Sequence, residues 1–512
     1  MWRAIRVAAG RRRARAALPP GAAPSPGAAS ALWGRVAILL ALAVSSLAVR
    51  VAAADVGSGR PGGADAALGG LDLQHSPDLP RLAIRRTRLD NGLRVVLSRD
   101  TSLPTVAICV TYGVGARNEA AGQQGFAQLL ERLMFQGSRN VAAGEHVRWI
   151  REHGGQATAN SSGDRTQFVD RLPATALALG LWLEADRMQA LELSDDDFER
   201  QLRRVRRESD RKGAQARAIG DQELRALVFR DYPATARGPL GSSSELSERR
   251  VSRPGTSLDS AQPTAHLQAL RDFHRQLYAP NNAVLSVVGN FEVLETLNLI
   301  HTYFADAASV SLPAAPGGAP PEQTEPRSVG LAGPATEAAS LWQGWAIPAP
   351  RTAEHDALDL AKVILGAGPS SRLQQLLVTE KGLAQTVLVW TDEQRGPDLF
   401  GVQATLTESA DPELVSRAIQ GQIASLARLG PSARELTRAQ NQLRSSLLLG
   451  LDGNRARAGA LADAELFGHD ARLLETDLER YRQVSRDDVQ RAVARYLRSA
   501  RRSEVRLRPQ AP

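Results

Sequence analysis

The sequence predicts an α+β fold of two similar domains, each an antiparallel sheet packed with helices. Its 512 residues exceed what one ordinary core accommodates. The composition, 43% hydrophobic and 23% charged residues, is typical of a globular protein. Strand-like and helix-like patterns are mixed on both sides of a Pro/Ala/Gly-rich segment. We therefore predict a linker at residues 306–336 between an N-terminal domain (84–305) and a C-terminal domain (337–510).

The N-terminal domain is expected to begin with a β-hairpin. Two strand-like segments in residues 87–98 flank the turn sequence Asp90-Asn-Gly92. Apolar runs at 105–112 and 283–289 predict two more strands. The spacing of apolar residues predicts helices elsewhere in this domain, at residues 122–136, 174–188, 196–212 and 267–278.

The C-terminal domain is expected to open with a strand at residues 340–347. Helical periodicity dominates the sequence after this strand. The predicted helices are at residues 354–365, 372–380, 412–429, 433–451 and 487–497.

The first 54 residues have the order of a secretory signal peptide. An Arg-rich stretch precedes an apolar run of 14 residues (36–49), and Ala52-Ala-Ala54 follows. We predict a signal peptide at 1–54, a flexible lead-in at 55–83, and a periplasmic or secreted protein without a membrane span after cleavage. A mitochondrial transit peptide is the alternative, because the leader is rich in Arg and contains no Asp or Glu.

The charge distribution argues against a nucleic-acid partner. The formal net charge is +8, and the leader contains eight arginines. The rest of the chain is therefore formally neutral, so no nucleic acid is expected as a partner. Cys109 is the only cysteine, which excludes an internal disulfide.

The segment Gly125-Phe-Ala-Gln-Leu-Leu-Glu-Arg-Leu-Met-Phe-Gln-Gly137 resembles the signature helix of the insulinase/pitrilysin zinc peptidases. That helix contains the motif His-x-x-Glu-His, whose two imidazoles hold zinc while the Glu acts as a base on metal-bound water. The resemblance places Gln128 and Arg132 at the two His positions. It places Glu131 at the position of the base.

The resemblance extends over roughly residues 84–508. Glu208 lies 76 positions beyond Arg132 and matches the family's third zinc ligand. The resemblance to the two-domain processing peptidases implies a metallohydrolase fold in a clamshell arrangement around a polar chamber. Further matching segments are Gly154-Gly155, Asp164-Arg-Thr-Gln-Phe168, Leu183-Glu-Ala-Asp-Arg-Met188, Leu365-Gly-Ala-Gly-Pro-Ser-Ser-Arg-Leu373 and Glu380-Lys-Gly-Leu-Ala384.

The resemblance also indicates which residues would bind substrate. Arg372 matches an Arg that positions the peptide, whereas Gln385 replaces the family's Tyr. Thr158 stands at the Asn of an edge segment that holds the substrate backbone, and Ala159 follows it. We expect these four residues to line the substrate site.

The altered ligand positions predict that zinc is absent and that the chain has no cofactor. An amide oxygen is a weak zinc ligand, and a guanidinium stays protonated with a pKa above about 12. Glu131 would then be idle. We expect Arg132 to form a salt bridge with Glu208 or Glu131, and Gln128 to donate a hydrogen bond to the same carboxylates.

Three functions follow from these observations. The chain is expected to be a catalytically inactive, substrate-binding subunit, in a heterodimer with an active insulinase-family peptidase, that binds peptides or unfolded polypeptides. The first alternative is an active zinc metalloendopeptidase with an altered metal site. The second is a stand-alone protein that binds extended peptides at a sheet edge.

Overall fold

A computed structural model describes residues 82–509, apart from 121, 122, 124, 214, 233–262, 314–320, 335–336 and 394. The predicted signal peptide and the lead-in as far as residue 81 lie outside the described residues. Within these residues, no helix combines the length and the apolar character needed to cross a membrane.

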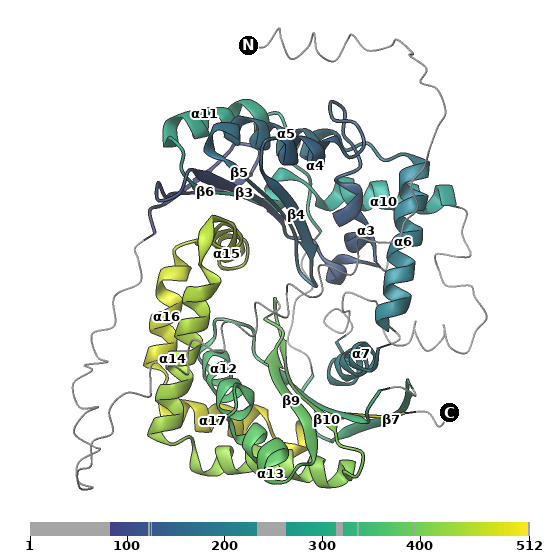
Figure 1. Ribbon diagram of the computed structural model, residues 1–512, viewed down its shortest axis with the longest axis vertical. Helices are drawn as coiled ribbons and strands as arrows, with labels where there is room; N and C mark the ends of the chain where they lie inside the picture. Colours follow the sequence, from purple (N-terminus) through teal and green to yellow (C-terminus); the bar gives the residue numbers. More distant parts are fainter. Residues whose placement is uncertain are drawn as a thin grey trace, which may run out of the picture. The chain divides into compact units, whose positions relative to one another are not determined.

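The first sheet has six strands in the order β1-β2-β6-β3-β5-β4. Strands β3 to β6 of this sheet are labelled in Figure 1. Its pairs are antiparallel except β2 with β6, which run parallel. The strand β4 pairs with β5 alone and is therefore an edge of the sheet. The strands are β1 (Ile84–Arg88), β2 (Arg94–Arg99), β3 (Thr105–Tyr112), β4 (Gln156–Ser161), β5 (Thr166–Pro173) and β6 (Ala283–Gly289).

Helices cover one face of this sheet and form the largest core with it. Alternate strand residues such as Val106, Ile108 and Val110 point into that core, where they meet apolar residues of the helices. The helices of this half of the chain are α3 (Phe126–Leu133), α4 (Glu145–Glu152), α5 (Leu177–Ala190), α6 (Asp195–Gly213), α7 (Ala216–Val228), α10 (Pro263–Leu277) and α11 (Val293–Phe304).

The second sheet has five strands in the order β7-β11-β8-β10-β9. Here β7 and β11 are parallel and the other pairs are antiparallel. The linker prediction for 306–336 is wrong at β7, because pairing with a strand from the far end of the chain fixes this segment as a strand. The strands are β7 (Arg327–Gly333), β8 (Ser340–Ile347), β9 (Ala384–Thr391), β10 (Asp398–Leu406) and β11 (Ser503–Pro509).

The second half of the chain is rich in helices, as predicted. The segment predicted as a helix at 372–380 is a π-helix over Gln374–Glu380. The α-helices are α12 (Ala353–Gly366), α13 (Pro412–Leu429), α14 (Ala433–Gly450), α15 (Gly453–Gly468), α16 (Leu473–Gln483) and α17 (Arg486–Tyr496). Single 3-10 turns occur in both halves of the chain. They are Ala116–Asn118, Ala174–Ala176 and Pro280–Asn282 in the first half and Ser499–Arg501 in the second.

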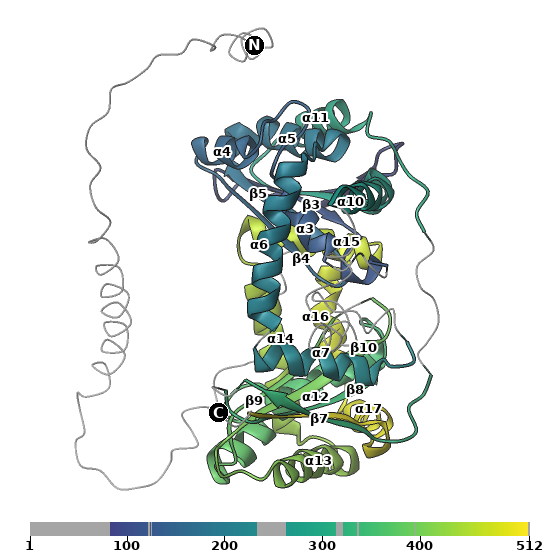
Figure 2. The ribbon, with the colours of Figure 1, turned by 90° about the vertical axis from the view of Figure 1, so that its right-hand side faces the viewer.

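Each half of the chain supplies one helix to the other half's sheet (Figures 1 and 2). The helix α15 packs against β3 and β6, where Leu461 and Leu466 meet the buried Cys109 and its neighbours. In return, α7 packs against β8 and β11, with Leu224 against the fully buried Trp342. Both sheets are therefore covered on two faces, and the two sheet-and-helix units predicted from the sequence share their hydrophobic cores.

Candidate functional site

The helix α3 carries the degenerate motif, and its apolar residues fix its orientation. Phe126, Leu129 and Leu130 are buried against the first sheet's core. Helical spacing then leaves Gln128, Glu131 and Arg132 half-buried. The Glu119 carboxylate accepts the backbone N–H groups of Gly125 and Ala127, at 2.8 and 2.9 Å, and stabilises the start of the helix.

Arg132 forms an ion pair with Glu208 of α6, which confirms the predicted salt bridge. Its Nη2 lies 2.5 Å from Glu208 Oε2, and the two side chains are 25% and 22% exposed. The other oxygen, Oε1, lies 3.4 Å from Nε of Arg204. Glu208 is therefore neutralised by guanidinium groups on both of its oxygens. The Nε of Arg132 is buried without a hydrogen-bond partner among the described residues.

Glu131 and Gln128 do not join this ion pair. Glu131 accepts a hydrogen bond from the hydroxyl of Ser161, the last residue of β4, at 2.6 Å. The Gln128 side chain makes no hydrogen bond to the described part of the chain, so the prediction that it donates to the carboxylates is wrong. Among the described residues, no hydrogen bond or ion pair joins the side chain of Gln128 or Glu131 to that of Arg132.

The residues at the motif positions do not fit a zinc ion. A structural zinc needs four donors, and a catalytic one needs three protein donors with an open position. Here the first ligand position offers an amide, the second a permanent cation, and the third a carboxylate already paired with that cation. Placing a divalent ion among them would require breaking the ion pair and bringing two positive charges together.

The edge strand β4 passes beside α3, and the two elements pack against each other. Thr158 and Ala159 lie in β4 opposite Val169 and Phe168 of β5, and both are half-buried. The Thr158 hydroxyl donates to the carbonyl of Val169 at 3.3 Å. Because β4 has a partner on one side only, its other side can accept an extended peptide as an additional strand.

Arg372 and Gln385 lie in the second half of the chain. The Arg372 guanidinium donates to both oxygens of Glu435, at 2.6 and 2.9 Å, and also to the carbonyl of Gly430. This hydrogen bonding lowers the pKa of Glu435 to about 2. Glu435 also caps α14 together with Ser432. Arg372 is therefore used to hold the start of α14, and Gln385 is exposed at the start of the edge strand β9.

A buried cluster of charged residues was not predicted as a group. His146 of α4 lies 3.0 Å from Asp170 of β5, and donor atoms of both lie within 4.8 Å of a Glu184 oxygen. Glu184 of α5 pairs with Arg187 one turn later. The Arg187 guanidinium stacks on the ring of Phe168, 4.1 Å from its centroid.

Burial shifts the titration of this cluster. It raises the pKa of Glu184 to about 7 and that of Asp170 to about 6, and it lowers the pKa of His146 to about 3. The three donors resemble a metal-ligand set, but the adjacent Arg187 already supplies the positive charge. The Glu-x-x-Arg spacing within Leu183-Glu-Ala-Asp-Arg-Met188 is the sequence signal for this pair.

Comparison with known families identifies the chain. The model of the insulinase family (peptidase family M16) matches residues 94–237, and the model of the peptidase M16 inactive domain matches residues 264–443. The chain belongs to the insulinase family. The first match includes the degenerate helix α3, and the second runs from α10 into α14.

Individual proteins support the same assignment over most of the chain. The zinc protease PqqE of Helicobacter pylori is 25% identical over 431 residues, which cover 82% of this chain and 92% of that protein. The crystal structure of a protease from H. pylori superimposes with a TM-score of 0.75 at 23% identity, covering 84% of this chain and all of that one. The peptidase M16 inactive domain from Pseudomonas fluorescens gives a TM-score of 0.71 at 18% identity, over 84% and 98% of the two chains. These likenesses confirm the fold predicted from the sequence.

Proposed function

We propose that this chain is a non-catalytic member of the insulinase family that binds peptides or unfolded polypeptides as the partner of an active zinc peptidase. The observation that carries the proposal is the ion pair between Arg132 and Glu208. It joins the second and third ligand positions of the family's zinc site by a direct contact. The polar residues around α3 are therefore stable together without a metal, and the site has no need of a cofactor.

The edge strand β4 supports the peptide-binding part of the proposal. The strand packs against α3, where the family binds substrate, and backbone hydrogen bonding to a free sheet edge does not require zinc. A heterodimer is proposed because two-chain members of the family divide catalysis and substrate contact between their subunits. The signal-like leader at 1–54 supports export to the periplasm or beyond.

Metal analysis combined with a cleavage assay tests the loss of catalysis. The full chain, purified and dialysed against buffer with added zinc, is expected to hold far less than one zinc per chain. It is also expected to leave an unfolded reporter polypeptide intact. Stoichiometric zinc together with cleavage that a chelator abolishes would reject the proposal.

Co-purification tests the partner. The chain should be co-expressed with an insulinase-family protein from the same organism that retains intact His-x-x-Glu-His, and each should carry a different tag. A stoichiometric complex that cleaves polypeptide faster than the active protein alone is expected. A monomer that neither associates with such a protein nor changes its rate contradicts the heterodimer.

The second candidate function is an active zinc metalloendopeptidase with an altered metal site. Two observations favour it: Glu131 and Glu208 are both present, and the relative from H. pylori is called a zinc protease. In that case Arg132 would have to leave Glu208 when zinc binds. Substitution of Glu131 by Gln separates the two functions, because it would abolish cleavage by an active enzyme and leave peptide binding unchanged in a non-catalytic one.

A further inference from the structure

A buried network of charged side chains joins α12, β10 and α16 in the second half of the chain. Its centre is His355 of α12, whose side chain is only 2% exposed. The ring Nε2 of His355 lies 3.0 Å from Asp398 of β10, and Nδ1 lies 3.2 Å from Asp359, one turn further along α12. Each ring nitrogen therefore faces a carboxylate oxygen. The network shares no residue with the candidate site on α3 and β4.

The contacts of Asp398 favour the charged form of its carboxyl group. Its Oδ1 accepts the backbone N–H of Leu399 at 2.8 Å, and its Oδ2 accepts that of Glu393 at 3.0 Å. Hydrogen bonds from backbone amides stabilise a carboxylate more than a protonated acid, because both oxygens of the carboxylate are acceptors. The group that faces Nε2 of His355 is therefore an anion.

Asp359 is an anion as well, and it connects three elements. Its Oδ1 accepts from Lys362 at 2.7 Å and from the hydroxyl of Thr391 in β9 at 3.0 Å, and its Oδ2 accepts from the hydroxyl of Tyr481 in α16 at 2.9 Å. Although burial opposes it, the hydrogen bond from His355 and the charge of Lys362 lower the pKa of Asp359 well below its ordinary value. The position of this carboxylate therefore affects how α12 packs on β9 and α16.

The two flanking carboxylates decide the charge of His355. A neutral imidazole has one N–H, so one of its nitrogens would direct a lone pair at a carboxylate oxygen. The imidazolium has two N–H groups and can donate to both sides. Burial by itself lowers the pKa of His355, but the contacts with Asp359 and Asp398 outweigh it and raise the pKa to about 9. Geometry and charge thus both indicate an imidazolium at neutral pH.

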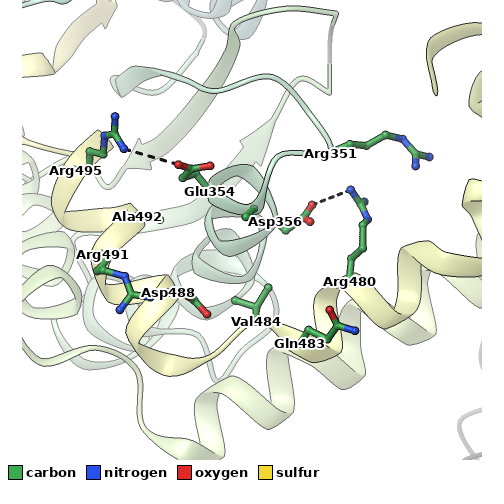
Figure 3. Close-up of a pocket in the computed structure, with 11 residues that line it drawn as sticks. Arg351, Glu354, Asp356, Arg480, Gln483, Val484, Asp488, Arg491, Ala492 and Arg495 are labelled. Carbon is green, nitrogen blue, oxygen red and sulfur yellow. Dashed lines mark hydrogen bonds and ion pairs between the residues drawn. The ribbon is translucent and has the colours of Figure 1, made fainter. Parts of the chain in front are cut away.

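Other charged groups near His355 belong to ion pairs of their own. These pairs are Asp356 with Arg480 of α16, Lys362 with Glu393 of the loop after β9, and Glu354 with Arg495 of α17. The first and the third lie at the hollow drawn in Figure 3. Among the described residues, none of these six side chains, and none of α14, which also packs on α12, forms a hydrogen bond or ion pair with His355. Its proton is therefore governed mainly by Asp359 and Asp398.

We propose that His355 is a pH-dependent switch in the second half of the chain: as a buried imidazolium it holds α12 to β10 directly and to α16 through Asp359, and it releases them in alkali. Loss of its proton to solvent leaves a neutral ring that can donate to only one of the two buried carboxylates, and the other loses its partner. The inference is independent of the proposed function, because the two sites have no residue in common.

The direction of the pH dependence follows from the raised pKa of His355. A group whose pKa is higher in the folded chain than its ordinary value of 6.5 contributes stability that is fully present below 6.5. That stability is lost as the pH rises through the folded pKa of about 9. The switch is therefore closed in acid and at neutral pH, and it opens in alkali.

NMR of the full chain with carbon-13-labelled histidine tests the charge directly. The Cε1–H resonance of a histidine moves when the ring loses its proton, and that of His355 is the one absent in His355→Gln. This resonance is expected to keep the position of an imidazolium up to about pH 8 and to move near pH 9. A His355 ring that is already neutral at pH 7, or still charged at pH 11, would overturn the proposal.

Asp398→Asn provides a test that keeps His355 in place, should His355→Gln fail to fold. The substitution preserves the volume and removes one flanking charge, so His355 should bind its proton at least about tenfold less tightly. One of the eight histidine resonances should therefore titrate at lower pH than in the wild type. Unchanged titration of all eight would also overturn the proposal.

Thermal unfolding at pH 7 and pH 10 measures the effect of the switch on stability. The unfolding midpoint of His355→Gln should lie several degrees below that of the wild type at pH 7, and the difference should shrink at pH 10, where the wild type has lost the same proton. The control is His301→Gln on α11, whose exposed side chain makes no hydrogen bond with the described residues and whose loss should leave the midpoint unchanged. An equal difference at both pH values for His355→Gln contradicts the switch.

Discussion

Replacing Arg187 by Met removes the positive charge from the buried cluster of the first half and leaves most of the volume in place. Arg187 is 1% exposed, and its guanidinium pairs with Glu184. In the variant, Glu184 and Asp170 remain buried and face only the neutral His146. Loss of one partner from a buried ion pair costs about 3–5 kcal/mol of unfolding free energy, because the other charge stays behind uncompensated.

The pH dependence of this loss follows from the shifted pKa values. Glu184 and Asp170 have folded pKa values of about 7 and 6, above their ordinary values. The stability that these two raised pKa values contribute is therefore fully present in acid. It is lost as the pH rises through the folded pKa values of the two carboxyl groups. The Arg187 charge lowers both pKa values in the wild type, so its removal raises them further. The same charge depresses the pKa of His146, and relief of that effect also favours the variant in acid. The loss of unfolding free energy caused by Arg187→Met should thus be larger at pH 8 than at pH 5.

Denaturant unfolding of both proteins at the two pH values measures this difference. The matched control is Arg200→Met on α6, where Arg200 forms the same i,i+3 pair with Asp197 but is 55% exposed. The control should lose no more than about 0.5 kcal/mol. A loss below about 1 kcal/mol for Arg187→Met, or an equal loss at both pH values, would refute the reasoning.

Three further variants test the rest of the structure. Gln128→His combined with Arg132→His should raise the zinc content of the dialysed protein from near zero to about one per chain, and a folded but metal-free variant would contradict the site assignment. Arg372→Ala should cost about 1 kcal/mol at pH 7, discounted for partial exposure. Because the pKa of Glu435 is lowered to about 2, that stabilisation is present above its ordinary pKa and lost as the pH falls towards 2, so unfolding curves of variant and wild type should converge in acid. Gly220→Ala should destabilise the chain by about 1–3 kcal/mol in thermal unfolding, because its Cβ would lie 2.3 Å from the buried tryptophan that α7 covers; a neutral effect would refute this packing.

Much of the sheet core could be predicted from local patterns. The strands at 105–112, 283–289 and 340–347 coincide with the predicted ranges. The first two consist mainly of apolar residues, and short apolar runs of this length are typical of buried strands. The Pro/Ala/Gly-rich composition around Arg327–Gly333 predicts a linker, whereas the structure has a strand there. Its conformation depends on pairing with Ser503–Pro509, and no local pattern carries that information.

The helix α15 was missed for a different reason. Its residues contact both the first sheet and α16, so apolar and small residues occur on more than one face, and amphipathic periodicity is weak. At the candidate site, the pairing of Arg132 with Glu208 could be predicted, because charge complementarity acts between positions that the family's fold holds together. The role of Gln128 could not, since an uncharged amide has many possible orientations and no dominant partner.

The ion pair between Arg132 and Glu208 explains how the fold tolerates the loss of two histidines. In a zinc peptidase the metal ties α3 to the helix that carries the third ligand, and here α3 packs on α6 with a direct salt bridge between them. Histidine-to-alanine changes would leave the half-buried carboxylate of Glu208 with only the longer contact to the exposed Arg204, which costs stability. An arginine at the second position supplies a permanent charge and a long side chain that reaches the same carboxylate. Under the proposed function, this ion pair preserves the link between the two helices without a Lewis acid, so the substitution would separate the structural role of the zinc site from its chemistry.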